Sequence, residues 1–302
     1  MSEGGILLVD KPEGPTSADV VRSVKRRFRP SAIGHLGTLD PMATGLLPLC
    51  IDDGTKIAQF LAAERKAYDG RIRLGRSTDT LDRTGRTTGE ASVPALDPGE
   101  LSALAARLVG PGSQRPPMFS AVKQGGRELY KLAREGIEVE REPRPIEIFA
   151  LALSPVPGDP GAIDFAVDCS KGTYVRVLAE EIAARLGSLG CLESLRRTGF
   201  GRFTVEEARP LVQVLEMTEL PLVRPREALR PAREIEVDRA TAFAIAAGQR
   251  DALARIGAPG AGDRLGAVIG PGGRLLAVVE AEGAGWSLRR VLDPEATRLY
   301  RA

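Results

Sequence analysis

The chain has 302 residues, of which 43% are hydrophobic and 27% charged, and its formal net charge is only +2. This length fits one large domain or a large and a small one. No apolar run approaches the roughly 20 residues of a membrane span, and the short apolar run at 6–9 follows an acid, unlike a signal peptide. We therefore expect a cytoplasmic protein with no membrane segment.

Cysteine and histidine usage argues against a metal site. The three cysteines, Cys50, Cys169 and Cys191, are widely spaced and form no C-x-x-C pair, which favours neither a disulfide framework nor zinc. His35 is the only histidine, so we expect no bound metal.

A basic helix is predicted after the segment GILLVDKP at 5–12. Apolar residues recur at helical spacing, Thr16 or Ser17 can cap the helix, and Pro30 would end it. Five basic residues lie on it with no acid among them: Arg22, Lys25, Arg26, Arg27 and Arg29. Such a face either contacts nucleic-acid phosphates or is simply solvated, and beside the sequence GHLGTLDP at 34–41 we favour phosphate contact.

The sequence GHLGTLDP at 34–41 has the composition of a ligand-facing loop. Gly34 and Gly37 allow backbone conformations closed to other residues and a close approach to a ligand. Pro41 biases Asp40 toward an extended geometry, so its carboxylate is presented rather than placed within a helix. The alternative is an Asp-Pro turn with no function.

The middle of the chain alternates predicted strands and helices, which indicates an α/β or α+β domain. An apolar segment leads to a turn at 52–54 and a helix from residue 55, and a strand is expected over 68–74. Residues 75–86 are expected to form a polar loop, and Asp97 to cap a helix over 98–109. Further strands are predicted at 144–153 and 162–170, joined by a turn at 157–161, before a helix at 173–186.

Two segments stand apart from this pattern. Residues 115–144 combine proline and glycine pairs with charges of both signs and a short helix at 127–134, which is typical of a functional insertion or of a surface helical hairpin. Residues 220–234 are rich in proline and charge and are expected to be a connector. Short apolar strands between glycines follow it and predict a small β-rich module of about 70 residues.

Five stretches, in order, resemble one known family. They are GILLVDKP at 5–12, GHLGTLDP at 34–41, KAYDGRIRLG at 66–75, CSKGTYVRVLAEEIAARLG at 169–187 and LRRTGFGRF at 195–203. Together they resemble the bacterial tRNA pseudouridine-55 synthases, the TruB family. The resemblance implies an α+β fold whose central sheet is mixed, mostly antiparallel and flanked by helices. It implies a catalytic domain at 1–230 with an RNA-gripping thumb at 115–144, and a PUA-like RNA-binding domain at 231–302.

The resemblance also implies an activity. Members isomerise uridine-55 in the T-loop of tRNA to pseudouridine after flipping the base out of its stack, an extrusion that costs a few kcal/mol. The reaction has no redox change, so no cofactor is expected. The expected partner is the T-arm of tRNA, with no obligatory protein partner, and the expected state is a monomer.

The resemblance assigns catalytic roles to three residues. Asp40 matches the essential carboxylate, expected to be the nucleophile, although its point of attack on base or ribose, or a role in removing a sugar proton, stays open. Arg176 matches the basic partner that keeps this carboxylate ionised, because a guanidinium stays charged when buried. Tyr68 matches the tyrosine that stacks on the target base, and its hydroxyl is a candidate for proton transfer at C5.

Other matches concern binding and support. Tyr174 and Leu195 match positions that line the uridine pocket, and His35 matches the histidine that fills the vacated stack or holds the flipped nucleotide. The remaining matched positions are expected to support the loop: Lys11, Pro12, Gly34 and Gly37. At Leu36, where the family commonly has a small or hydroxylated residue, we expect a change of packing and not of chemistry.

Two other functions share these features. The first is a guide-RNA-dependent pseudouridine synthase that works inside a ribonucleoprotein. The long insertion at 115–144 and the short C-terminal module favour a stand-alone enzyme. The second is an RNA-binding or RNA-folding protein that has lost catalysis, against which Asp40, Tyr68 and Arg176 argue.

Overall fold

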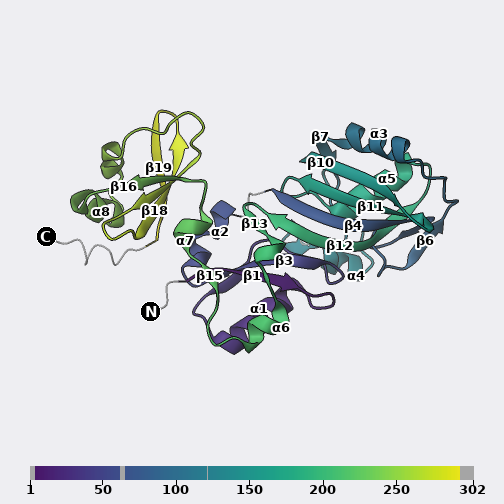
Figure 1. Cartoon of the computed structure of the whole chain (residues 1–302), viewed down its shortest axis with the longest axis horizontal. Helices are drawn as coiled ribbons and strands as arrows, with labels where there is room; N and C mark the ends of the chain where they lie inside the picture. Colours follow the sequence, from purple (N-terminus) through teal and green to yellow (C-terminus); the bar gives the residue numbers. More distant parts are fainter. Residues whose placement is uncertain (1–3, 62–64, 121, 293–302) are drawn as a thin grey trace.

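The computed structural model describes residues 4–61, 65–120 and 122–292, and its centre is an eleven-stranded sheet (Figure 1). Eight strands follow the order β14-β1-β3-β12-β4-β11-β10-β7, and β2, β13 and β15 pair with β3, β12 and β1. The bounds are β1 (Gly5–Lys11), β2 (Ile33–His35), β3 (Thr44–Ile51), β4 (Lys66–Leu74), β7 (Gly110–Gln114), β10 (Arg144–Val156), β11 (Asp159–Cys169), β12 (Gly190–Phe200), β13 (Phe203–Thr204), β14 (Arg209–Pro210) and β15 (Leu222–Val223).

This sheet is mixed and mostly antiparallel, which confirms the predicted α+β class. Within it, parallel pairing occurs between β1 and β14 and between β3 and β12. Strand β12 lies between β3 and β4, so Arg197 is opposite Gly45 on one side and opposite Tyr68 on the other. A segment near residue 197 is thereby placed beside the loop that precedes β3.

Helices pack against the sheet and the loops at its ends. They are α1 (Ser17–Phe28), α2 (Gly54–Leu61), α3 (Pro98–Leu108), α5 (Val175–Arg185), α6 (Leu211–Glu216) and α7 (Pro225–Ala228), with a 3-10 turn η1 (Val205–Glu207). Thr16 caps α1 through a capping box with Asp19, and Asp97 caps α3, as predicted. Helix α1 ends at Phe28, and Arg29 adopts a left-handed conformation ahead of Pro30.

Strand β1 is buried on both faces. Leu7 and Val9 belong to the core cluster that contains Tyr68, whereas Ile6 and Leu8 belong to a second cluster on the other face. A strand buried on both sides needs a continuous apolar run, which explains the sequence ILLV.

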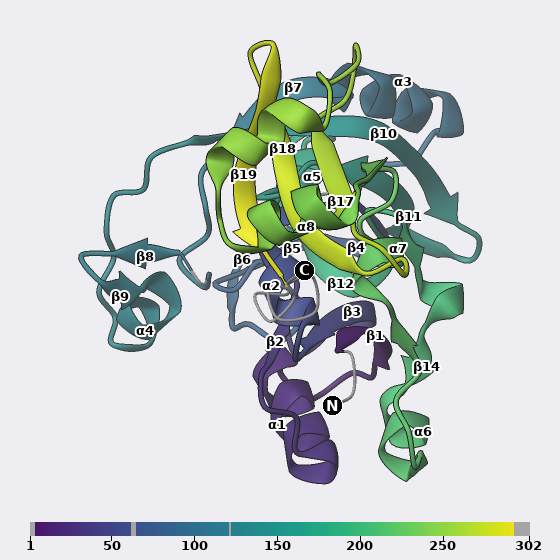
Figure 2. The same ribbon diagram turned by 90° about the vertical axis from the view of Figure 1, so that its left-hand side faces the viewer.

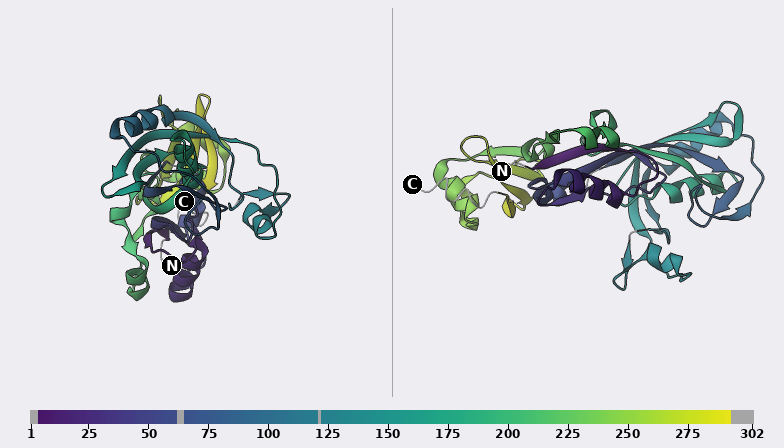
Figure 3. Two further views of the ribbon diagram at one scale, coloured as in Figure 1. Left: turned by 90° about the vertical axis from the view of Figure 1, so that its right-hand side faces the viewer. Right: turned by 90° about the horizontal axis from the view of Figure 1, so that it is seen from below.

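The predicted insertion at 115–144 leaves the sheet between β7 and β10. Its hairpin strands are β8 (Lys123–Gln124) and β9 (Arg127–Glu128), followed by α4 (Leu129–Arg134). This helix starts two residues later than predicted, and residue 121 lies outside the described part of the chain. The right-hand view of Figure 3 shows the segment projecting away from the sheet.

The C-terminal module is a four-stranded sheet covered by helices (Figure 2). Its elements are β16 (Arg233–Glu236), α8 (Arg239–Ala246), the 3-10 helix η2 (Arg250–Arg255), β17 (Leu265–Ile269), β18 (Leu275–Glu282) and β19 (Gly285–Val291). The four strands confirm the predicted β-rich module. Helix α8, capped by Asp238, was not predicted.

The expected connector at 220–234 leads from the eleven-stranded sheet to the four-stranded one, and it has regular structure of its own. β15 pairs with β1, and Ala228 and Leu229 are buried in the second core cluster. The same cluster contains Val278 and Leu292 of the C-terminal module. A sequence rich in proline and charged residues does not reveal which of its apolar residues pack against a distant strand.

Two other local predictions need correction. The expected polar loop at 75–86 contains β5 (Arg76–Thr78), which pairs with β6 (Thr87–Glu90), and it places Asp82 in a buried position. The turn expected at 157–161 is shorter, because β11 already begins at Asp159 and Gly158 provides the left-handed residue. No helix in the described ranges is long and apolar enough to cross a membrane.

Candidate active site

The loop at 34–41 is anchored from both sides. The Ser17 hydroxyl accepts a hydrogen bond from the Leu39 amide (2.8 Å) and donates one to the Leu39 carbonyl (3.2 Å). Lys11, fully buried, donates from Nζ to the carbonyl of Pro41 (3.3 Å). The backbone on either side of Asp40 is therefore held by side chains of β1 and α1.

Lys11 also organises the turn that follows β1. Its Nζ donates to the carbonyl oxygens of Pro12 (2.8 Å) and Pro15 (2.9 Å). Burial lowers the pKa of Lys11 to about 8, and the nearby carboxylate of Asp40 opposes this shift. The ammonium group thus binds three carbonyl oxygens from two backbone segments. It holds the turn after β1 against the loop that contains Asp40.

Within the loop, the two glycines differ. Gly37 has φ of 93°, a left-handed conformation that favours glycine, whereas Gly34 has no such requirement. Leu36 is 2% exposed and packs in the second core cluster.

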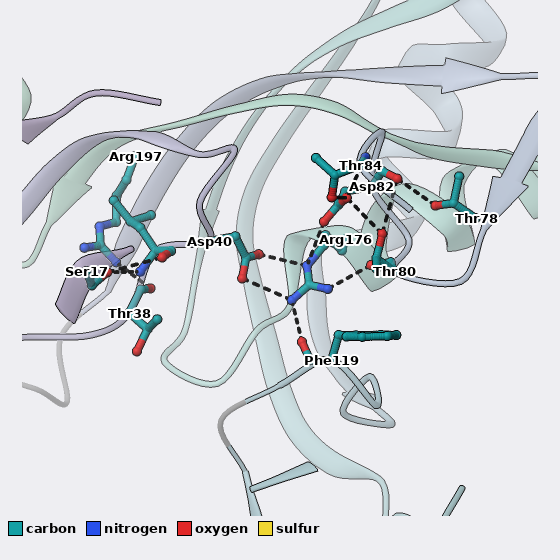
Figure 4. Close-up of polar contacts among 11 residues, drawn as sticks. Ser17, Thr38, Asp40, Thr78, Thr80, Asp82, Thr84, Phe119, Arg176 and Arg197 are labelled. Carbon is teal, nitrogen blue, oxygen red and sulfur yellow. Dashed lines mark hydrogen bonds and ion pairs between the residues drawn. The ribbon is translucent and has the colours of Figure 1, made fainter. Parts of the chain in front are cut away.

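Asp40 is held by Arg176 through two nitrogen atoms (Figure 4). Nε of Arg176 lies 2.8 Å from Oδ2 of Asp40, and Nη2 donates to Oδ1 over 3.2 Å. Arg176, in the first turn of α5, is 6% exposed, whereas 34% of the Asp40 side chain is exposed. The buried guanidinium fixes the carboxylate and leaves it accessible from solvent.

The remaining donors of Arg176 bind the protein backbone. Nη1 donates to the carbonyl of Thr80 and Nη2 to the carbonyl of Phe119, each over 2.8 Å. Phe119 lies at the base of the 115–144 insertion. Arg176 therefore links the loop of Asp40 to two other segments of the chain.

A second carboxylate, that of the buried Asp82, lies beside this pair and was not predicted. Its Oδ2 is 4.0 Å from Nε of Arg176. Its Oδ1 accepts hydrogen bonds from the hydroxyl of Thr80 (2.9 Å) and from the amide (2.9 Å) and hydroxyl (2.6 Å) of Thr84. The guanidinium of Arg176 thus faces two carboxylates, and Figure 4 shows all three groups.

The protonation of Asp40 depends on these neighbours. Burial raises the pKa of Asp40, Arg176 opposes this rise, the charge of Asp82 adds to it, and Lys11 opposes it. A nearby cation favours the ionised form of a carboxylate whose pKa desolvation raises. Arg176 is the cation closest to it among the described residues.

Tyr68 and Leu195 lie on neighbouring strands, and each is 7% exposed. Tyr68 on β4 belongs to the same core cluster as Leu195 on β12. Burial raises the pKa of Tyr68, and the guanidinium of Arg197 opposes that rise. The charge of Asp40 adds to the rise.

Tyr174 and His35 precede the two members of the ion pair in sequence, Tyr174 two residues before Arg176 and His35 five before Asp40. Tyr174 is half-buried and immediately precedes α5, where its amide donates to Oε1 of Gln114 (2.8 Å). His35 ends β2 and is half-buried, and its Nδ1 is buried without a hydrogen-bond partner. Burial lowers the pKa of His35, which favours the neutral imidazole at neutral pH.

The basic residues of α1 have different surroundings. Arg22 pairs with Asp19, while Lys25, Arg26 and Arg29 are exposed. Arg27 donates from Nε to the carbonyl of Leu215 (3.0 Å) and from Nη2 to that of Met217 (2.8 Å), so it holds the end of α6. This part of the predicted phosphate-binding face is engaged with the protein itself.

Arg197 was also missed by the sequence analysis. It is fully buried and donates from Nε to the carbonyl of Leu46 (2.7 Å) and from Nη2 to the carbonyl of Gly37 (3.2 Å). A signal existed, because residues 195 and 197 of a strand share one face and Leu195 was expected to face the pocket.

The three cysteines are free and buried, and no group of metal-ligating side chains occurs in the described ranges.

Comparison with known proteins gives this arrangement a family. A family model described as "TruB family pseudouridylate synthase (N terminal domain)" matches residues 25–175. A tRNA pseudouridine synthase B of Psychrobacter cryohalolentis is 45% identical over 232 residues, which are 75% of this chain but only 63% of that protein's length. Another, from Aromatoleum aromaticum, is 43% identical over 298 residues, which are 97% of this chain and 94% of that protein.

Solved structures agree on the fold. A chain in the crystal structure of a Cbf5-Nop10-Gar1 complex matches with a TM-score of 0.71 and 20% identity, covering 99% of this chain and 88% of its own length. That identity establishes a common fold and no more. The higher identity of the bacterial relatives, nearly end to end in one case, decides the family: this chain belongs to the TruB family of pseudouridylate synthases.

Proposed function

We propose that this protein isomerises uridine-55 in the T-loop of tRNA to pseudouridine. The observation that carries the proposal is the partly exposed carboxylate of Asp40, held in a fork by a buried arginine. The reaction breaks the bond between uracil N1 and the ribose, turns the base and forms a bond from C5 to the same carbon. A proton leaves C5 and N1 gains one, so no electron donor or acceptor is required.

In this proposal, Asp40 is the essential carboxylate and acts as the nucleophile. Covalent catalysis by a carboxylate requires its ionised form. Arg176 supplies the compensating charge, and Lys11 with Pro12 holds the loop in place. The arrangement supports the proposal because neither backbone nor guanidinium has to reorganise to present the carboxylate.

The uridine enters between residues from three segments. Tyr68 stacks on the flipped base and exchanges a proton at C5, while Tyr174 and Leu195 line the pocket. A neutral His35 holds the flipped nucleotide or fills its place in the stack, and an unpaired buried nitrogen on the imidazole suits such contact. Flipping costs a few kcal/mol, which RNA contacts elsewhere must offset.

Those contacts are assigned to three regions. The thumb at 115–144 grips the T-arm, the PUA-like domain at 231–302 binds RNA beyond it, and exposed Lys25, Arg26 and Arg29 of α1 contact phosphates. Residues 293–302 of the PUA-like domain lie outside the described chain. We place the protein in the cytoplasm, acting as a monomer with no obligatory protein partner.

The decisive experiment uses an unmodified tRNA transcript incubated with the purified protein, without added metal or guide RNA, followed by mapping of pseudouridine. We expect modification at position 55. Asp40→Asn should abolish it while tRNA binding changes by less than about tenfold, or roughly 1.4 kcal/mol. Asp53→Asn is the matched control, because Asp53 is an exposed aspartate paired with Lys56.

Three outcomes would overturn the proposal. Activity that persists in Asp40→Ala would remove the carboxylate from the chemistry. Product that appears only with a guide RNA would favour a ribonucleoprotein enzyme. Tight tRNA binding with no product under any condition would leave an RNA-binding protein that has lost catalysis.

A further inference from the structure

Arg197 is a buried cation with no acidic partner among the described residues. It is 0% exposed, and its guanidinium donates to the carbonyl oxygens of Leu46, Gly37 and, over 3.5 Å, Thr38. Desolvating an ion costs several kcal/mol unless other groups compensate. Neutral carbonyl dipoles replace part of the lost hydration but leave the charge uncancelled.

The loop and the strand meet at this residue. Gly37 and Thr38, which accept hydrogen bonds from it, lie two and three residues before Asp40. On the other side, Arg197 is directly opposite Tyr68 in the antiparallel pairing of β12 with β4, and cross-strand partners project from the same face. The guanidinium is close enough to act electrostatically on the Tyr68 hydroxyl.

The packing leaves this side chain little freedom. The ring of Phe200, itself 1% exposed, lies 5.4 Å from Cζ of Arg197. Gly45 of β3 passes so close that a Cβ there would be 2.3 Å from the carbonyl oxygen of Arg197. The backbone of Arg197 is therefore held against β3, while the ring of Phe200 and the carbonyls of the loop confine its guanidinium.

A fixed positive charge favours the deprotonated form of a neighbouring phenol. It opposes the rise that burial causes in the pKa of Tyr68. Isomerisation requires a group that takes the proton from C5, and a phenolate oxygen that does so becomes a phenol. Arg197 would make this transfer easier without touching the substrate.

Resting on the proposed function, we propose that Arg197 is a positioning residue that fixes the Tyr68 hydroxyl against the Asp40 loop and stabilises its phenolate for removal of the C5 proton. The residue acts on the reaction through Tyr68, and its bonds to the carbonyls of the loop hold the guanidinium in place. Its neighbour Arg196 faces the other way and pairs with Asp10 through two hydrogen bonds (3.0 and 2.7 Å). Arg196 is therefore the matched control on the same strand.

The test is a double-mutant cycle in single turnover, with tRNA that carries 5-deuterouridine at the target position. Tyr68→Phe should slow turnover by about 100-fold, within the range of general acid-base catalysis. Arg197→Met should slow the wild type by about tenfold or more, yet change the Tyr68→Phe enzyme less than about twofold. It should also raise the deuterium isotope effect and shift the pH profile to higher pH, because the charge that favours the phenolate is gone.

Arg196→Met should change none of these quantities. Arg197→Lys keeps the charge but makes fewer contacts with the loop, so its pH profile should return toward that of the wild type. This variant replaces Arg197→Met in the test if Arg197→Met does not fold. The inference would be overturned if Arg197→Met or Arg197→Lys slowed the wild type and the Tyr68→Phe enzyme equally. An isotope effect and pH profile that Arg197→Met leaves unchanged would also overturn it. Absence of product from the wild type would instead overturn the proposed function.

Discussion

Nη2 of Arg176 donates to both Oδ1 of Asp40 and the carbonyl of Phe119, so this carboxylate and the start of the 115–144 insertion share one donor. With Nε also facing Oδ2, Arg176 uses a planar fork that lysine cannot reproduce. The geometry of the pair and the protonation of Asp40 are therefore set by the same side chain.

Replacing Arg176 by lysine should lower kcat by about 100-fold or more, comparable to the loss of one preorganised donor. The pKa of Asp40 should rise further, because burial raises it and Arg176 opposes that rise. Because the proposed role of Asp40 needs its ionised form, the acid limb of the kcat profile should move to higher pH. Arg185→Lys, on the same helix in an exposed pair with Glu181, is the control. An unmoved acid limb would contradict this account of Arg176.

Asp82→Asn should shift the acid limb in the opposite direction. The charge of Asp82 raises the pKa of Asp40, so its removal should let Asp40 ionise at lower pH. At neutral pH, kcat should still fall about tenfold, since an amide facing Nε would hold Arg176 less well. The measurement is kcat from pH 4 to 8, with tRNA affinity expected to stay unchanged. Movement of the limb toward higher pH would disprove the like-charge effect.

Neighbouring arginines on α1 should behave differently. Arg26→Ala should weaken tRNA binding and reduce the slope of log K against log salt by about 1, the value for one phosphate contact. Arg27→Ala should instead lower the free energy of unfolding by about 1 kcal/mol, because its bonds to Leu215 and Met217 are lost. Salt titrations of binding and urea unfolding separate the two. Identical salt slopes for wild type and Arg26→Ala would remove α1 from the RNA interface.

Lys11 should give the protein a distinctive alkaline stability. Its pKa is lowered from 10.5 to about 8, so between these values the unfolded chain binds more protons than the folded one. The free energy of unfolding should then rise with pH across this window, by about 3 kcal/mol in full. Lys11→Met should lack this rise, whereas a variant of exposed Lys25 should keep it. Urea unfolding at pH 8 and 10 measures the difference, and parallel curves for wild type and Lys11→Met would refute it.

Local patterns predicted most of the elements and part of the site. Asp40 could be found because glycines and a proline surround it within eight residues, and Arg176 and Tyr68 through their motifs. Asp82 could not, because its burial depends on Arg176, which is 94 residues away in the sequence, and on a turn whose threonines look like any polar loop. Arg197 was hidden in an Arg-Arg pair whose two members face opposite sides of β12.

The shared core at Ile6, Leu8, Val278 and Leu292 means that the chain offers no clean place to cut at residue 230. Removing the C-terminal module would expose apolar side chains of β1 and leave Lys56 without the Leu292 carbonyl that it binds over 2.7 Å. A truncated enzyme would therefore lose stability together with any RNA contacts. Substitutions on the surface of the module, rather than its deletion, should be used to measure its contribution to tRNA binding.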